Sequence, residues 1–86
     1  MKNFTYTITD PLGIHARPAG LLAKAAKAYA DTVITVEKNG SAVKASQLMK
    51  LMGLGVKQGD VVTVTAEGAS EDAAIAAMKE FFQNNL

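Results

Sequence analysis

The chain has 86 residues with a formal net charge of +1, and 49% of the residues are hydrophobic. This length and composition predict one globular domain over residues 1–86, built around a single core, rather than a disordered chain. The small net charge, with only two tyrosines, three phenylalanines and no tryptophan, argues against a nucleic-acid-binding protein.

Residue types that the sequence lacks exclude further classes of site and location. Without cysteine there is no disulfide or thiol chemistry, and a single histidine leaves too few ligands for a structural zinc ion. No glycine-rich phosphate loop supports a nucleotide-binding enzyme. No apolar run approaches the ~20 residues of a membrane span and no secretory signal opens the chain, so we expect a cytoplasmic protein without membrane insertion.

The first predicted element is a strand that leads into a turn. Phe4, Tyr6 and Ile8 alternate with threonines, which is the period of a half-buried strand. The segment Asp-Pro-Leu-Gly at residues 10–13 predicts a turn, so the strand is expected to end shortly before it.

A helix is predicted next, over residues 16–30. This segment is mostly alanine, leucine and lysine, which favour helices. Pro18 is compatible with a helix only because it falls in the first turn, where amide protons have no helical partner. His15, the only histidine, is therefore expected at or next to the N-cap.

The start of this helix has the chemistry of an anion site. The first helical amides have no partner, the helix dipole adds partial positive charge, and Arg17 adds a planar cation. An imidazole nitrogen is a nucleophile near neutral pH, so His15 is suited to accept a phosphoryl group and give it up again. We expect the guanidinium of Arg17 and the backbone of Ala16, Arg17 and Pro18 to stabilise that group. From these residues alone, a surface histidine without chemistry stays an open alternative.

Helical spacing divides the predicted helix into two faces. One face is expected to point to the core and consists of Ala19, Leu22, Ala26 and Tyr29. The other face mixes cations with one leucine and consists of Arg17, Gly20, Leu21, Lys24 and Lys27. Spacing alone favours a solvated face, and the alternative is a docking surface beside His15 for acidic partners.

The middle of the chain predicts a β-hairpin. Residues 32–37 are largely β-branched and are typical of a strand. Asn39 and Gly40 form the strongest two-residue hairpin signal, and a short return strand is expected over residues 42–44. The two strands are therefore expected to pair antiparallel.

A short helix is predicted between Ser46 and Met52. Ser46 is expected to act as its N-cap. Its apolar residues are too many for a short helix to bury on one face, so some must be exposed. Leu51 is assigned to the core, whereas the others are interpreted as an exposed, adaptable contact patch, namely Leu48, Met49 and Met52.

The last third of the chain predicts a strand and a helix. Residues 60–66 have the alternating pattern of a strand, with Val62, Val64 and Ala66 on one face. A turn is expected at residues 68–69, followed by Ser70 as the N-cap of the final helix. The first turn of this helix carries acidic residues, as the dipole favours. Its apolar stripe is predicted to be Ala74, Met78 and Phe81, with Ile75 and Phe82 beside it.

The predicted order is strand, helix, strand, strand, helix, strand, helix, which indicates an α+β protein with one face of a sheet under helices. The pattern alone leaves a ferredoxin-like arrangement open. Threonines at positions 5, 7, 35, 63 and 65 fit a sheet face turned to solvent.

Two stretches resemble one protein family. Residues 13–19 (Gly-Ile-His-Ala-Arg-Pro-Ala) resemble the active-site signature of HPr, the histidine phosphocarriers of the bacterial phosphoenolpyruvate-dependent sugar phosphotransferase system. Residues 48–55 (Leu-Met-Lys-Leu-Met-Gly-Leu-Gly) match the same family, and the resemblance covers essentially the whole chain. It implies an open-faced β-sandwich, with an antiparallel four-stranded sheet in the order 1-4-2-3 and three helices on one face.

The resemblance also implies a function. His15 is expected to accept a phosphoryl group on Nδ1 from phosphorylated enzyme I and to pass it to enzyme IIA domains of sugar transporters. Such a protein is a carrier rather than an enzyme, and we expect a monomer without metal or cofactor. The surface that docks partners in the family corresponds here to Gly20, Leu21, Lys24, Lys27, Leu48, Met49 and Met52.

One family feature departs from this sequence. In many HPr proteins of Gram-positive bacteria, an ATP-dependent kinase phosphorylates a serine at the start of the short helix. Counting forward from Gly40 or back from Leu54 places that serine at Gln47. Ser46 has the same ordinal number in the chain as the family's serine but not the same spacing from Gly40 and Leu54. We therefore favour a capping role for Ser46 and keep it as a weaker candidate phosphosite.

Two other functions remain alternatives at this point. One is a phosphocarrier of a nitrogen-related branch that does not feed sugar uptake. The other is a regulatory binding module with the HPr fold but without phosphotransfer, against which the presence of His15 argues.

Overall fold

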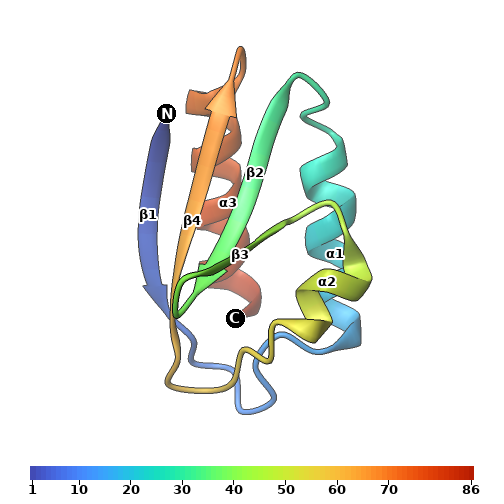
Figure 1. The fold of residues 1–86 in the computed structure, drawn as a ribbon, viewed down its shortest axis with the longest axis vertical. Helices are drawn as coiled ribbons and strands as arrows, with labels where there is room; N and C mark the ends of the chain where they lie inside the picture. Colours follow the sequence, from blue (N-terminus) through green and yellow to red (C-terminus); the bar gives the residue numbers. More distant parts are fainter.

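The computed structural model describes residues 1–86 and has the predicted order of elements. These are β1 (Lys2–Thr7), α1 (Ala16–Lys27), β2 (Thr32–Lys38), β3 (Ser41–Lys44), α2 (Leu48–Gly53), β4 (Val61–Gly68) and α3 (Glu71–Asn85). All strand pairs are antiparallel and form one sheet in the order β1-β4-β2-β3 (Figure 1). This order confirms the arrangement that the HPr resemblance implies and excludes the ferredoxin-like alternative.

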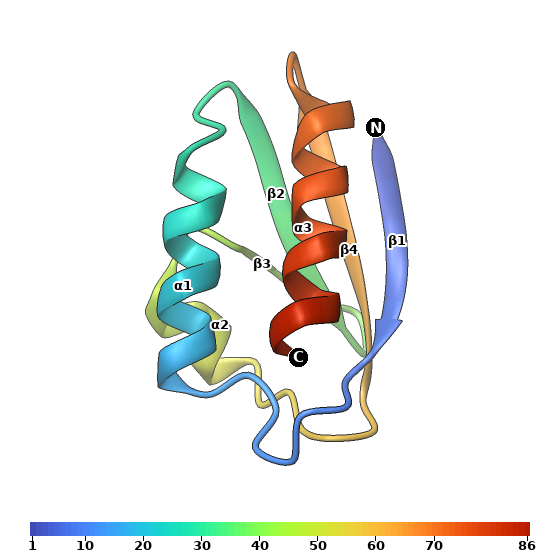
Figure 2. The same ribbon diagram turned by 180° about the vertical axis from the view of Figure 1, so that it is seen from behind.

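Helices cover only one face of the sheet. Figure 2 shows α1 and α3 lying side by side across this face, and α2 packs beside α1 near the end of β3. None of the helices combines the length and the apolar character that a membrane span needs. The other face of the sheet carries the predicted threonines, with Thr5 opposite Thr63 and Thr35 opposite Thr65, all exposed or half-buried. The prediction of a solvent-facing polar side is confirmed.

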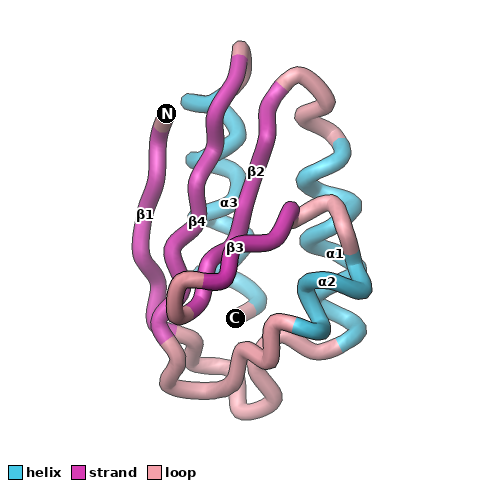
Figure 3. The backbone as a smooth tube through the Cα atoms, in the orientation of Figure 1, coloured by secondary structure: helices cyan, strands magenta, loops and turns pink.

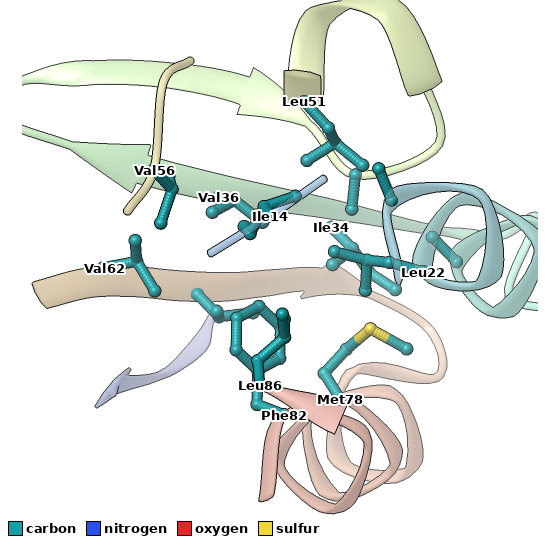
Figure 4. Packing of buried hydrophobic residues seen from close by; sticks show 14 of the residues in the cluster. Ile14, Leu22, Ile34, Val36, Leu51, Val56, Val62, Met78, Phe82 and Leu86 are labelled. Carbon is teal, nitrogen blue, oxygen red and sulfur yellow. The ribbon is translucent and has the colours of Figure 1, made fainter. Parts of the chain in front are cut away.

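The core lies between the helices and the sheet, and every helix contributes to it (Figure 4). Leu22, Leu51 and Met78 are fully buried, as is Phe82. The Phe82 ring stands edge-on to two β1 rings, with centroids 5.9 Å from Phe4 and 5.6 Å from Tyr6. Burial of one such side chain stabilises the fold by about 1.5–3 kcal/mol, so this layer holds α3 on the sheet.

The hairpin between β2 and β3 has the predicted two-residue loop. Lys38 lies opposite Ser41, which leaves Asn39 and Gly40 as the loop. Both have positive φ, +51° and +85°, as a type I′ turn requires. The Asn-Gly signal therefore predicts the turn and the register together.

The predicted end of α1 at residue 30 is wrong. The helix ends at Lys27, and the next amides bond three residues back, from Ala28 to the Ala25 carbonyl (3.3 Å) and from Tyr29 to the Ala26 carbonyl (3.1 Å). These tighter bonds end the helix and let the chain turn into β2. Alanine composition carries no stop signal, so the sequence could not mark this end.

Ser46 is not the N-cap of α2. The N-cap is Gln47, and Ser46 lies in the turn before it. Ser70 does occupy the N-cap of α3, but its hydroxyl donates to Asp31 Oδ2 (3.0 Å) instead of accepting from a helical amide. In both cases the tertiary path of the chain overrides the local preference of serine for capping.

Two smaller predictions also need correction. Gly68 is the last residue of β4 rather than part of the following turn. The centre of the buried α3 stripe is Phe82, whereas Phe81 is only partly buried. Phe81 and Phe82 are adjacent on the helix, and the packing of α3 on the sheet determines that Phe82 faces the core.

Candidate functional site

His15 lies at the N-cap of α1, as predicted. Its backbone is extended (φ −104°, ψ −175°), and its carbonyl accepts the first helical bond, from the Ala19 amide (2.9 Å). The side chain is half-buried and makes no capping hydrogen bond. The imidazole is therefore held at the helix entrance with its ring nitrogens free to react.

The backbone beside His15 presents two free donors. The amides of Ala16 and Arg17 make no hydrogen bond within the chain, and no acidic residue lies in the first turn of α1. Pro18 has no amide hydrogen, so the prediction that its backbone helps to stabilise a phosphoryl group is wrong as far as donation is concerned. Pro18 is buried and contributes by packing the first turn.

Arg17 supplies a permanent positive charge next to the imidazole. It is exposed and takes part in none of the ion pairs of the chain. An unpaired guanidinium next to two free helical amides is a strong arrangement for binding an oxyanion. The structure therefore places His15, the free Ala16 amide and Arg17 next to one another at the start of α1.

These groups open onto a shallow depression of about 260 Å³. Its lining comes from the β1–α1 loop, α1 and the end of α3, namely Asp10, His15, Arg17, Pro18, Leu21, Asn84 and Asn85. Asp10, Asn84 and Asn85 were not predicted as site residues. No local signal marks the two asparagines, because only the packing of α3 on the sheet brings residues so distant in sequence to His15.

The loop that carries His15 is fixed by contact with the α2–β4 loop. Gly13 has φ +65°, and a Cβ there would collide with the Val56 carbonyl and lie 2.7 Å from Lys57 Cα. The next residue, Ile14, is buried and donates its amide to the same Val56 carbonyl (3.2 Å). Figure 3 shows the two loops running together at one end of the molecule. Gly13 is therefore required by this close approach.

The same loop is also tied to the end of α3. Within it, the Gly13 amide donates to the Asp10 carbonyl (3.0 Å) and the Leu12 amide to Asp10 Oδ1 (2.8 Å), which confirms the predicted turn. The Leu86 carbonyl accepts from the amides of Thr9 (2.6 Å) and Asp10 (2.9 Å) and from Thr9 Oγ1 (2.9 Å). These bonds position the α3 end beside His15.

A surface next to the depression carries the remaining predicted residues. On α1, Leu21 is exposed together with Lys24 and Lys27, and Gly20 is half-buried. On α2, which packs beside α1, Leu51 is buried as predicted while the predicted contact residues are exposed, Leu48 by 39%, Met49 by 77% and Met52 by 40%. We call these exposed residues, with Gly20, the basic–apolar surface. Leu12, exposed by 70% on the active-site loop, was not predicted.

Ser46 lies away from this depression. It is half-buried and lines a different cavity of about 280 Å³, together with Lys27 and Lys44. Gln47 is exposed at the start of α2, where the family count places the regulatory serine.

Fold and site together define a small phosphocarrier, with its single histidine at a helix N-terminus. The family description "PTS HPr component phosphorylation site" matches residues 2–84, and the chain belongs to the HPr family. It acts as a phosphocarrier of the phosphotransferase system and not as an enzyme on its own.

Named relatives agree with this assignment. Phosphocarrier protein HPr of Mycoplasma genitalium is 39% identical over 85 residues, covering 99% of this chain and 97% of that protein. A crystal structure of HPr from Thermoanaerobacter tengcongensis has a TM-score of 0.91 at 40% identity, covering 98% of this chain and 93% of that one. An HPr dimer from the same organism has a TM-score of 0.76 at 40% identity, covering 98% and 95%.

Proposed function

We propose that His15 is the residue that carries the phosphoryl group, bound through Nδ1. The observation that supports this most directly is that a free imidazole and an unpaired guanidinium line one depression, at a helix start with two free amides. No other histidine or cysteine exists in the chain to serve as acceptor.

In the proposed step, the lone pair of Nδ1 attacks the phosphorus of phosphorylated enzyme I. The bond between phosphorus and the donor atom of enzyme I breaks, and that atom keeps the electron pair. The guanidinium of Arg17 and the amides of Ala16 and Arg17 then hold the equatorial oxygens. The reverse sequence delivers the group to an enzyme IIA domain. Because the site is shallow, the partner completes the surroundings of the transition state.

A phosphotransfer assay tests this proposal. The chain is incubated with enzyme I, magnesium and phosphoenolpyruvate, and its intact mass is measured at alkaline pH, where phosphohistidine survives. We expect one added phosphoryl group that is lost on acid treatment and absent from His15→Gln. A wild-type chain that gains no mass beside a competent HPr control, or a His15→Gln variant that still gains it, contradicts the proposal.

We also propose that the basic–apolar surface docks both enzyme I and enzyme IIA domains. Its lysines suit acidic partners, and its exposed methionines adapt to different apolar surfaces. Lys24→Glu and Lys27→Glu, each made alone, are expected to raise the KM for enzyme I with little change in kcat. The matched control is Lys79→Glu, an exposed lysine on α3 outside this surface. Equal effects at both places would contradict a local docking role.

Ser46 is the remaining candidate for regulation. We propose that Gln47 occupies the regulatory position of the family and that a serine kinase finds no efficient substrate in this chain. Ser46 is half-buried and precedes the N-cap, which supports the proposal. Incubation with ATP and an HPr kinase is expected to leave the mass unchanged, whereas Gln47→Ser is expected to gain one phosphoryl group. Phosphorylation of wild-type Ser46 would contradict it.

We further propose that residues 1–86 act as one monomeric domain in the cytoplasm. One hydrophobic cluster joins residues of all three helices and of the sheet, which supports a single folding unit. Light scattering after size exclusion is expected to give the 9.0 kDa mass of one chain. A dimer, the state named for one Thermoanaerobacter HPr crystal structure, would contradict the monomer.

A further inference from the structure

One polar side chain in the depression around His15 has neither a partner nor a role in the mechanism above. Asn84, in the last turn of α3, lines the depression together with His15 and Arg17. It is exposed, and its carboxamide makes no hydrogen bond within the chain, whereas the neighbouring Asn85 donates to the Phe81 carbonyl (3.0 Å). Two adjacent asparagines at the depression therefore differ, because the carboxamide of Asn84 is wholly free whereas that of Asn85 is held by the helix backbone.

The end of α3 would by itself oppose an anion in this depression. The C-terminal carbonyls of a helix carry partial negative charge, and the last turn of α3 has no basic residue to offset it. The Leu86 carbonyl, which follows α3, is covered by donors from Thr9 and Asp10. The side chain of Asn84 places a free amide donor at the same helix end, where it offsets part of this negative charge toward an anion in the depression.

We propose that Asn84 is a ligand of the phosphoryl group, donating a hydrogen bond from Nδ2 to a phosphoryl oxygen on His15. This inference rests on the proposed role of His15. A phosphoryl group has about −1.5 to −2 charges and three strong acceptor oxygens. The start of α1 and the end of α3 lie at the same end of the molecule (Figure 2), and Arg17 and Asn84 both line the depression. Arg17 and the two free amides would therefore approach the group from α1, which leaves its α3 side to Asn84.

A neutral donor suits a carrier that must release its cargo. A second cation at this place would hold the phosphoryl group more tightly and slow its delivery, whereas an amide adds one hydrogen bond without charge. Asp10, the one carboxylate lining the depression, already has Oδ1 engaged by the Leu12 amide (2.8 Å). The balance of one guanidinium, one carboxylate and one amide keeps the phosphorylated state reversible.

Two measurements test the role of Asn84. The first is the equilibrium constant for transfer from phosphorylated enzyme I to the chain. The second is the pKa of the phosphoryl group, followed by phosphorus NMR. The variants are Asn84→Ala and Asn84→Asp. The matched controls are Gln83→Ala and Gln83→Glu, which make the same changes at an exposed amide of the same helical turn that does not line the depression.

Asn84→Ala is expected to shift the equilibrium against the phosphorylated chain by about fivefold, the effect of one lost hydrogen bond. It is also expected to raise the pKa of the phosphoryl group, because a donor to its dianionic form is lost. Asn84→Asp is expected to shift the equilibrium by about tenfold or more, because it adds a like charge. The Gln83 variants are expected to stay within about twofold of wild type, less than the effect of one hydrogen bond.

If Asn84→Ala changes neither the transfer equilibrium nor the pKa of the phosphoryl group, this inference is overturned. Equal effects of Asn84→Asp and Gln83→Glu would also overturn it, because they would indicate only a long-range effect of the added charge. Failure of the proposed function gives a different result, since the wild-type chain itself would then gain no phosphoryl group at His15. Circular dichroism of each variant confirms that the compared chains are folded.

Discussion

Replacing Gly13 by alanine is expected to lower the free energy of unfolding by about 2–5 kcal/mol and to impair phosphotransfer. A non-glycine residue at φ +65° costs about 1–2 kcal/mol. The new Cβ would also collide with the Val56 carbonyl and with Lys57 Cα, and relieving such overlap against backbone costs about 1–3 kcal/mol more. The loop that carries His15 must move to relieve it.

Two other glycines separate these contributions. Gly55 has φ +71° but open space around it, so Gly55→Ala is expected to cost only the backbone part, about 1–2 kcal/mol. Gly20 lies inside α1 with open space, so Gly20→Ala is expected to stabilise the protein by about 0.5–1 kcal/mol. Equilibrium unfolding in urea, followed by circular dichroism, measures all three free energies under the same conditions.

The order of the three variants decides whether the reasoning holds. If Gly13→Ala loses no more stability than Gly55→Ala, the close approach to Val56 has no energetic weight. If Gly20→Ala destabilises the protein, the accounting of helix propensity and free space is wrong. The phosphorylation rate of Gly13→Ala, compared with that of Gly55→Ala, shows how far the loop position matters for His15.

Three further predictions follow from other parts of the structure. Phe82→Ala is expected to lower the free energy of unfolding by about 3–5 kcal/mol, and a loss below 1 kcal/mol in urea would contradict its central place in the core. Lys38 Nζ lies 2.8 Å from Asp60 Oδ2, and this hydrogen bond lowers the Asp60 pKa. Asp60→Asn is therefore expected to lower the free energy of unfolding above pH ~4, and the difference from wild type is expected to disappear as the pH falls further. A difference that does not depend on pH in urea unfolding would refute this prediction. Arg17→Ala is expected to slow phosphorylation by enzyme I at least about tenfold through loss of a charge-assisted hydrogen bond, and Arg17→Lys is expected to recover only part of it in a stopped-flow assay.

Much of the site was predictable because its signals are local. Pro18 in a first turn and the alanine-rich segment after it place His15 at the N-cap, and the Asp-Pro-Leu-Gly turn precedes it. The Asn-Gly pair likewise predicts the hairpin loop and its register. In each case a backbone preference of a few neighbouring residues is sufficient.

The remaining features depend on contacts between distant segments. The end of α1 follows from the path of the chain into β2, and the place of Ser46 follows from how β3 joins α2. Periodicity allowed Phe81 or Phe82 to be the central core residue, and the sheet selects Phe82. Asn84 reaches the depression only after α3 has packed, so no reading of neighbouring residues would have placed it there.

The pairing of β1 with β4 determines when the molecule can become active during its synthesis. The β2–β3 hairpin joins neighbours in the chain and can form early. Lys2 of β1, in contrast, pairs with Ala66, and the Thr9 amide donates to the Leu86 carbonyl, so both contacts need nearly the whole chain. Contacts of such sequence separation form late and slowly. A chain still emerging from the ribosome therefore has His15 but no finished depression around it, so we expect phosphoryl transfer to His15 only once α3 has docked.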